Sequence, residues 1–336
     1  MASPTSTVLW NISSPSPEKT SAQSLPTPTI GFDVDSYEQT YNTALAILFS
    51  GVIFFGVLLN SIIVFTVYRW PEMRTPCNLL IVNIAVGDLA VASLGAPLRI
   101  IEAFVGWPFG NFLCSVLLPL LEMFVTVSVV THTTIALERF RAIVRPLKTR
   151  LSLRNTKLVI FAIWPACYVA SALPIAPVLK VQEIDGLDRC YPQWPFELYR
   201  PIYQVYLVTL FIAVPLVIQT MAYFRIMKAL QNRLTPMCAM ALDRNILSRA
   251  IQYQKRRRVI KTLAIMVFAF QVCYIPRAVM LMFYEFGIKS VDWTSFKYAD
   301  LVILIIYYLK HVLNPIILFA SSRDFQRWSC LQIFCR

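Results

Sequence analysis

Residues 47–67 read ILFSGVIFFGVLLNSIIVFTV and contain no charged side chain. A helix that crosses the hydrocarbon core of a bilayer needs about 20 predominantly apolar residues. This stretch meets that requirement, and we expect a membrane span over 42–68. The whole chain agrees, because 57% of its 336 residues are hydrophobic and 15% are charged, whereas a soluble domain carries about 25% charged residues. The sequence therefore predicts an integral membrane protein.

Six further apolar stretches of similar length follow along the chain. They predict spans over 77–104, 112–143, 156–179, 201–228, 259–286 and 298–320. After the last span, Phe325, Trp328 and Leu331 share one face, which is typical of a short helix on the membrane surface. The expected fold is an all-α membrane protein: a seven-transmembrane helix bundle over 42–320, then an amphipathic helix and short cytoplasmic tail over 321–336. Residues 1–41 are rich in Ser, Thr and Pro and are predicted to form a disordered extracellular tail.

The net charge of +13 would suit a nucleic-acid partner, but its distribution favours a membrane instead. The basic residues gather in the loops after the first, third and fifth spans, for example within 141–157 and 225–261. Loops rich in Lys and Arg stay in the cytoplasm, so we expect the N-terminus outside and the C-terminus inside. The expected location is the plasma membrane, with the basic loops contacting membrane lipids and with no nucleic-acid partner.

This orientation predicts three covalent modifications. Asn11 begins an N-glycosylation sequon, which is usable on the outer face. Of the eight cysteines, only Cys114 and Cys190 reach the oxidising side, where a disulfide would fix the fourth loop over the third span; the alternative is two free thiols. Cys330 and Cys335 follow the surface helix and are candidates for palmitoylation, the alternative being two unmodified thiols.

Polar residues and prolines recur inside the apolar spans. A bilayer core offers no hydrogen-bond partners, so intramembrane polar groups must find partners within the protein. Each such residue alone is a weak signal, but their order, one set for each span, is specific. They are Asn60, Asp88, Arg139, Trp164, Pro215 with Tyr223, Phe270 with Cys273-Tyr274-Ile275-Pro276, and Asn314-Pro315.

In this order the residues resemble the markers of the rhodopsin-like (class A) G-protein-coupled receptors, over residues 42–335. Glu138-Arg139-Phe140 matches the Asp/Glu-Arg-Tyr triplet of that family, and the Cys114–Cys190 pair matches its disulfide. The resemblance implies a cell-surface receptor that activates heterotrimeric G proteins and needs no cofactor. An enzyme is not expected, because the chain has two histidines, both inside spans, and no metal-ligand or Ser/His/Asp cluster.

Three positions depart from the family pattern. Phe140 replaces the tyrosine of the triplet, and Tyr274 stands where the family usually has a tryptophan. Leu318 stands where the seventh-span motif normally ends in a tyrosine that supports the active state. Leucine forms no hydrogen bonds, so we expect that part of the mechanism to differ.

The stretches WPFGNFLC and ALERFRAIVRPLK are similar to those of the neuropeptide-receptor branch. The retinal-binding lysine of opsins would fall at Tyr308, and the aspartate of amine receptors at Leu121, so neither signature is met. Arg277 is expected to pair with a ligand carboxylate, or alternatively with Glu122 or Asp300. Remaining alternatives are a lipid or other small-molecule ligand, or an opsin-like photoreceptor without the usual lysine. The expected ligand-binding residues are Arg99, Glu102, Glu122, Gln204, Tyr274, Arg277, Asp300, Tyr307 and Tyr308.

The resemblance also implies how the receptor signals. A ligand near Tyr274 bends the sixth span about Pro276, and Arg139 with Pro146 and Leu147 then contacts the G protein. Beyond Arg327 only Ser329 could be phosphorylated, so arrestin recruitment through the tail is expected to be weak. The expected activation residues are Asn60, Asp88, Glu138, Arg139, Phe140, Phe270, Pro276, Lys310, His311, Asn314 and Pro315.

Lys310 and His311 lie in the middle of the seventh span, where charge is costly and usually functional. In similar receptors these positions face Asp88 across a polar cavity that often holds sodium. A buried aspartate needs a partner, so we expect the Lys310 ammonium to pair with Asp88 in place of sodium. The alternative is that Lys310 points elsewhere and Asp88 is protonated. His132, in the third span, is expected to be a hydrogen-bonded core histidine or else a pH-sensitive gate.

Overall fold

The structure is a computed structural model that describes residues 34–145, 151–184, 186–239, 244–286 and 293–328. Within some of these ranges the side chains of 34–38, 233–253, 255–256, 284 and 293–298 are not described. The predictions made for Asn11, Pro146, Leu147, Cys330 and Cys335 lie outside the described residues and stay predictions.

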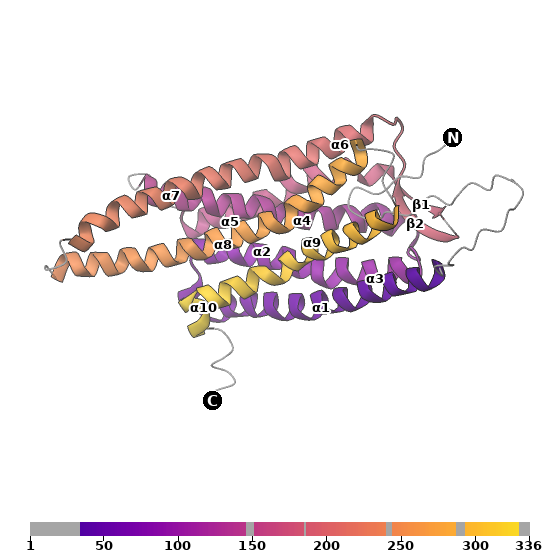
Figure 1. Cartoon of the computed structure of the whole chain (residues 1–336). Helices are drawn as coiled ribbons and strands as arrows, with labels where there is room; N and C mark the ends of the chain where they lie inside the picture. Colours follow the sequence, from indigo (N-terminus) through magenta and orange to yellow (C-terminus); the bar gives the residue numbers. More distant parts are fainter. Residues whose placement is uncertain (1–33, 146–150, 185, 240–243, 287–292, 329–336) are drawn as a thin grey trace, which may run out of the picture.

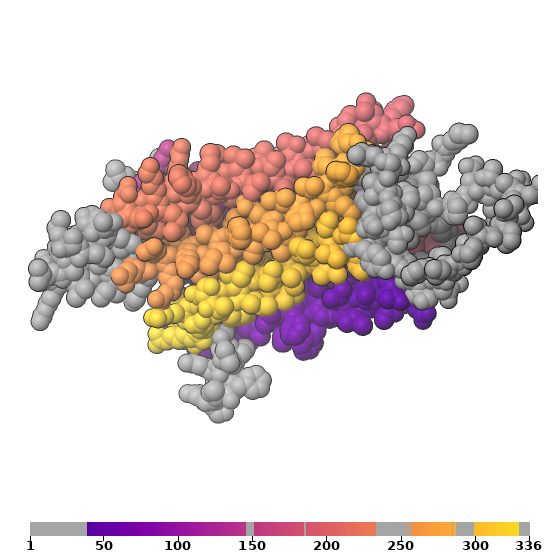
Figure 2. All heavy atoms as spheres, viewed as in Figure 1, coloured from indigo at the N-terminus to yellow at the C-terminus, as the bar shows by residue number. Residues whose placement is uncertain are grey.

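Seven helical segments in the described part of the chain are long and apolar enough to cross a membrane, which confirms the predicted fold class. They run side by side between two ends of an elongated bundle (Figure 1), and α1, α9, α8 and α7 form adjacent strips on the face shown in Figure 2. Large apolar side chains such as Phe54, Phe161 and Phe224 are exposed on the outside, where lipid would cover them. The helices are α1 (Val34–Arg69), α2 (Pro76–Ala90) with α3 (Ala96–Phe104), α4 (Gly110–Val144), α5 (Leu153–Cys167), α6 (Tyr199–Val208) with α7 (Val214–Ala239), α8 (Arg244–Phe286) and α9 (Trp293–Ser321).

Three spans contain a wide π-helical turn, and each turn comes just before a proline. The turns are η2 (Val91–Gly95), η3 (Tyr168–Ala172) and η5 (Thr209–Ala213), followed by Pro97, Pro174 and Pro215. A proline has no N–H and its ring clashes with the carbonyl four residues earlier. In each case that carbonyl belongs to the π segment, so the wide turn accommodates the proline without ending the span.

A β-hairpin covers one end of the bundle. β1 (Leu179–Ile184) pairs antiparallel with β2 (Leu187–Pro192), after the short helix η4 (Ala176–Val178). Cys190 in β2 forms the predicted disulfide with Cys114 at the start of α4, which confirms that pairing. The loop before α4 contacts the hairpin at Gly106, where a Cβ atom would lie 2.5 Å from the Asp188 carbonyl oxygen. Only glycine fits that approach, and its φ of 79° is in the region that favours glycine.

The opposite end carries the short helix α10 (Arg323–Trp328), near η1 (Pro71–Met73). The Trp70 indole donates a hydrogen bond of 3.1 Å to the Trp328 carbonyl oxygen, and the two indole rings lie 4.8 Å apart. Phe325 is buried in the same contact region. Phe325 and Trp328 of the apolar face predicted for the surface helix therefore pack at this end of the bundle, while Arg323 and Arg327 are exposed. Leu331, the third residue of that face, lies outside the described residues.

Replacing both Cys114 and Cys190 by serine should lower the thermal midpoint of the detergent-solubilised protein. The bond closes a separation of 76 residues, and a loop of that size is worth about 4 kcal/mol in the chain-entropy model. Dithiothreitol should lower the midpoint of the unmodified protein and leave that of the double variant unchanged. Equal midpoints for the two proteins in the absence of reductant would contradict the expectation.

Candidate ligand pocket and the polar core beneath it

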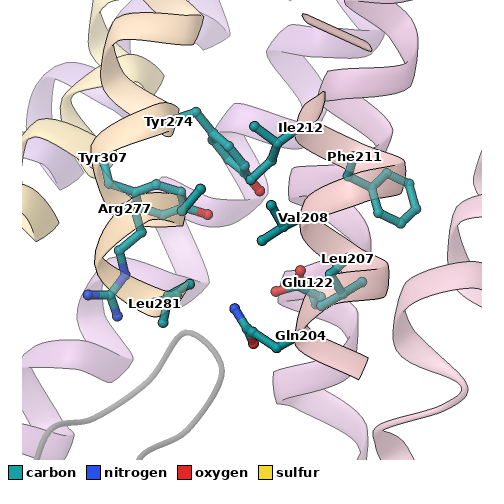
Figure 3. A pocket seen from close by; sticks show the side chains of 11 residues that line it. Glu122, Gln204, Leu207, Val208, Phe211, Ile212, Tyr274, Arg277, Leu281 and Tyr307 are labelled. Carbon is teal, nitrogen blue, oxygen red and sulfur yellow. The ribbon is translucent and has the colours of Figure 1, made fainter. Parts of the chain in front are cut away.

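A small cavity of about 30 Å³ lies between α4, α6, α8 and α9, toward the hairpin end of the bundle. Five of the predicted ligand-binding residues line it together, although they come from four different helices (Figure 3). These five are Glu122, Gln204, Tyr274, Arg277 and Tyr307. The structure does not bring Arg99, Glu102, Asp300 and Tyr308 to the lining, and apolar residues of α6 and η5, such as Leu207 and Phe211, complete it.

Arg277 is occupied by an internal partner. Its guanidinium forms a buried ion pair with the carboxylate of Asp300 from α9. The expectation that Arg277 pairs with a ligand carboxylate is therefore not supported by this geometry, and the alternative of a salt bridge to Asp300 is confirmed. Arg99 and Glu102 lie 3.4 Å apart, and the Arg99 Nε also lies 3.4 Å from the Tyr308 hydroxyl. Each of these pairs neutralises a buried charge within the bundle.

Among the described residues, Glu122 forms no ion pair, whereas the buried acids Glu102 and Asp300 each pair with an arginine. The Glu122 side chain is 6% exposed, and its Oε2 atom has no hydrogen-bond partner among the described residues. Gln204 lines the same cavity as Glu122, and Figure 3 shows both side chains across the cavity from the Arg277 guanidinium. The pocket lining therefore contains a carboxyl oxygen without a partner, and an arginine whose charge Asp300 neutralises.

A column of aromatic rings runs from the pocket toward the middle of the bundle. Tyr274 stacks on Phe270 with ring centroids 5.1 Å apart, and Phe270 stacks on His132 at 5.2 Å. The His132 Nδ1–H donates to the Ser128 carbonyl oxygen at 2.8 Å, as expected for a hydrogen-bonded core histidine. The Lys310 ammonium lies 5.0, 5.2 and 5.6 Å from the ring centroids of Phe270, Tyr274 and Tyr307, within cation–π range.

Asp88 is the centre of the polar core, but Lys310 is not its partner. Asp88 Oδ1 accepts a hydrogen bond of 2.7 Å from His311 Nδ1, and Oδ2 accepts one of 2.8 Å from Asn314 Nδ2. Lys310 Nζ has no hydrogen-bond partner in the part of the chain that the structure describes. The expected Lys310–Asp88 pair is thus wrong for this structure. Consecutive residues on a helix differ by about 100° in direction, and that rotation turns His311 toward α2 and Lys310 toward the rings of α8.

Two asparagines connect further spans to this core. Asn60 Nδ2 donates to the backbone oxygens of His311, at 2.9 Å, and Gly56, at 2.8 Å. Asn83, which the sequence reasoning missed, accepts a hydrogen bond of 3.0 Å from the Trp164 indole and donates one of 2.8 Å to Thr131. The available signal was an asparagine within the apolar run LLIVNIAV, because a bilayer would leave it without a partner.

A larger cavity of about 580 Å³ opens at the α10 end of the bundle. Glu138 and Arg139 from α4, Ile260 and Leu263 from α8, and Leu318 from α9 are among its lining residues. Arg139 Nε lies 2.9 Å from Glu138 Oε2, but the pair is not aligned as a hydrogen bond. Phe140 is half-buried, with the Arg145 guanidinium 5.8 Å from its ring centroid.

A family model described as the 7 transmembrane receptor (rhodopsin family) matches residues 59–318. The chain belongs to this family of receptors. The neuropeptide Y receptor type 2 of Cavia porcellus is 29% identical over 293 residues, which cover 84% of this chain and 74% of that one. The tachykinin-like peptides receptor 99D of Drosophila melanogaster is 27% identical over 314 residues, covering 88% and 57%. The neuropeptide FF receptor 1 of Rattus norvegicus is 30% identical over 241 residues, covering 68% and 55%. These relatives confirm the similarity to the neuropeptide-receptor branch.

One departure of this receptor from its family lies at the larger cavity. The Tyr223 hydroxyl is buried and has no hydrogen-bond partner among the described residues. Leu318 is also buried and lines the cavity, where the family usually has a tyrosine. Because leucine has neither a donor nor an acceptor, it cannot satisfy the hydroxyl of Tyr223.

Replacing His311 by alanine should destabilise the receptor by about 3 kcal/mol, because removing one partner leaves the buried Asp88 carboxylate partly uncompensated. The thermal midpoint of the solubilised protein measures this loss. Leu309→Ala is the matched control, since Leu309 lies two residues earlier on the same helix and is exposed on the outside. Adding Asp88→Asn to His311→Ala should recover part of the loss, because the double variant has no uncompensated charge. Strictly additive losses would contradict the pairing.

Replacing Lys310 by methionine should leave the thermal midpoint unchanged or raise it. Methionine retains a flexible apolar stem that fills the same space. Burying an ammonium without hydrogen bonds costs more free energy than its cation–π contacts with the aromatic rings recover. If Lys310 instead paired with Asp88, the same substitution would lower the midpoint about as much as His311→Ala does.

Proposed function

We propose that this receptor binds an extracellular peptide and, in response, activates heterotrimeric G proteins. The observation that carries the proposal is that α4, α8 and α9 line both the small pocket at the hairpin end and the larger cavity at the other end. A ligand that favours one packing of these helices would therefore also bias the shape of the second cavity. Pro276 lies inside α8, between Tyr274 and Arg277. Sharp bends in helices commonly occur at prolines, so we expect α8 to bend there.

The chemistry of the pocket supports a peptide over a lipid. A carboxylate, a guanidinium, an amide and two phenol groups lie on its lining, and burying such groups against a hydrocarbon ligand would leave them without partners. The names of the relatives reported above describe receptors for neuropeptides or peptides. A receptor for a small polar molecule is the second candidate, and it is favoured by the small volume of the pocket.

The orientation that suits this function places the hairpin end outside the cell. Arg69 ends α1 at the α10 end, and Arg141 and Arg145 end α4 beside the larger cavity. Basic residues at the ends of spans favour the cytoplasm. In this proposal the receptor lies in the plasma membrane with its N-terminus outside, and the cavity beside Arg139 receives the G protein.

Arg139→Ala should reduce peptide-stimulated G-protein dissociation at least about tenfold while peptide binding persists, because Arg139 lies at the cavity remote from the pocket. Cells that express the receptor are challenged with a neuropeptide library, and dissociation of a panel of Gα subunits is recorded. Arg141→Ala is the matched control, because this exposed arginine two residues away does not line the cavity. Full signalling by Arg139→Ala, or loss of signalling in both variants alike, would contradict the assigned role.

A further inference from the structure

The buried charges near the hairpin end are nearly all compensated by partners inside the protein. Arg277 pairs with Asp300, and Arg99 lies 3.4 Å from Glu102. At the rim, Arg200 pairs with Glu285 at 2.8 Å. These ion pairs neutralise the charges of the three arginines, although the Arg277 Nε atom has no hydrogen-bond partner among the described residues.

Of the two charged residues that line the pocket, Arg277 has an ion-pair partner, and Glu122 has none among the described residues. It lies on α4 opposite Arg277, and its Oε2 atom is buried without a hydrogen-bond partner in the described structure. The Arg277 guanidinium is directed away from it (Figure 3). An ionised carboxylate in such a site is costly until a cation or a donor reaches it.

We propose that Glu122, with the neighbouring Gln204 amide, forms a subsite for a positively charged group of the ligand: the guanidinium or ammonium of a basic peptide residue. The part of the inference that concerns a peptide rests on the function proposed above. Glu122 supplies the charge, Gln204 supplies an amide oxygen as acceptor, and the rings of Tyr274 and Tyr307 flank the same cavity and attract cations at their faces.

The size of the cavity agrees with a single head group. Its volume of about 30 Å³ has room for about two water molecules, which is the scale of an ammonium or a guanidinium rather than of a whole side chain. A ligand anion would meet the Glu122 charge and an arginine that Asp300 has already neutralised. The subsite therefore selects cations. The sequence had instead suggested that Arg277 binds an anionic group of the ligand.

Lys310 is the internal competitor for Glu122. Its ammonium lies over the rings of the same two tyrosines, and no described residue forms a hydrogen bond with it. If Lys310 served as the partner of Glu122 during signalling, Glu122→Gln would change ligand-free signalling without changing any preference for ligand charge. A ligand subsite instead requires that the preference for ligand charge disappear.

The first experiment compares synthetic, C-terminally amidated hexapeptide pools that contain arginine with matched pools in which citrulline, its neutral isostere, replaces it. Dissociation of G protein is measured in cells expressing the receptor. Arginine pools should be at least about tenfold more potent on the unmodified receptor, since a hydrogen bond to a charged partner is worth that much. The ratio should fall to near one in Glu122→Gln and persist in Glu122→Asp.

Glu183→Gln is the matched control. It removes the same charge from an exposed residue of β1 at the same end of the bundle, outside the pocket. The preference for arginine should survive in this variant. Equal loss of preference in Glu183→Gln and Glu122→Gln would overturn the subsite, because it would indicate long-range attraction by the acidic surface.

The second experiment needs no peptide. Thermal midpoints of the purified receptor are compared in methylguanidine and in methylurea, a neutral isostere, at equal concentration. Methylguanidine should stabilise the unmodified receptor more than methylurea, and Glu122→Gln should abolish the difference. If all peptide pools are silent but methylguanidine still discriminates, the peptide-receptor function fails and the cation subsite stands. If peptides activate equally with arginine or citrulline and methylguanidine does not discriminate, the subsite is overturned while the receptor function stands.

Discussion

The fully buried carboxylate of Asp88 is the constraint on which the rest of the bundle depends. A bilayer supplies no water to solvate it, so partners must come from other helices. His311 and Asn314 supply them at 2.7 and 2.8 Å, and Asn60 then reaches the His311 backbone oxygen. This chain of hydrogen bonds joins α1, α2 and α9 and fixes the rotation of α9 about its own axis. That rotation decides which residues of α9 face the pocket above.

With His311 turned toward Asp88, Lys310 faces the rings of Phe270 and Tyr274 on α8. The same rotation places Tyr307 on the pocket lining and Asp300 on Arg277. Within the described residues, the Lys310 ammonium beneath the two tyrosines and the Oε2 atom of Glu122 both lack a hydrogen-bond partner. Uncompensated charges are costly in a membrane protein and are expected where a ligand or a second conformation supplies the missing partner.

Prolines give the spans a shape that straight helices would lack. The three π-helical turns place the prolines of the second, fourth and fifth spans without ending them, and η5 contributes Phe211 and Ile212 to the pocket. Pro276, by contrast, sits in a continuous α8 at the level of the pocket, between the lining residues Tyr274 and Arg277. A wide turn is a common feature of functional sites in helices because it re-aims the side chains that follow.

The sequence by itself determined the seven spans. The length of an apolar stretch is a local property of the sequence, and it decides whether the stretch can cross the bilayer core. It also determined the disulfide, since only Cys114 and Cys190 were placed on the oxidising side, and it named five of the residues that line the pocket but not the apolar ones. It could not choose between Lys310 and His311 as the partner of Asp88, since both lie within one helical turn of Asn314 on the same stretch. Nor could it assign Arg277 to Asp300 or leave Glu122 without a partner. Those outcomes depend on how each helix is rotated and how closely it approaches its neighbours, and packing among all the spans fixes both only in the tertiary structure.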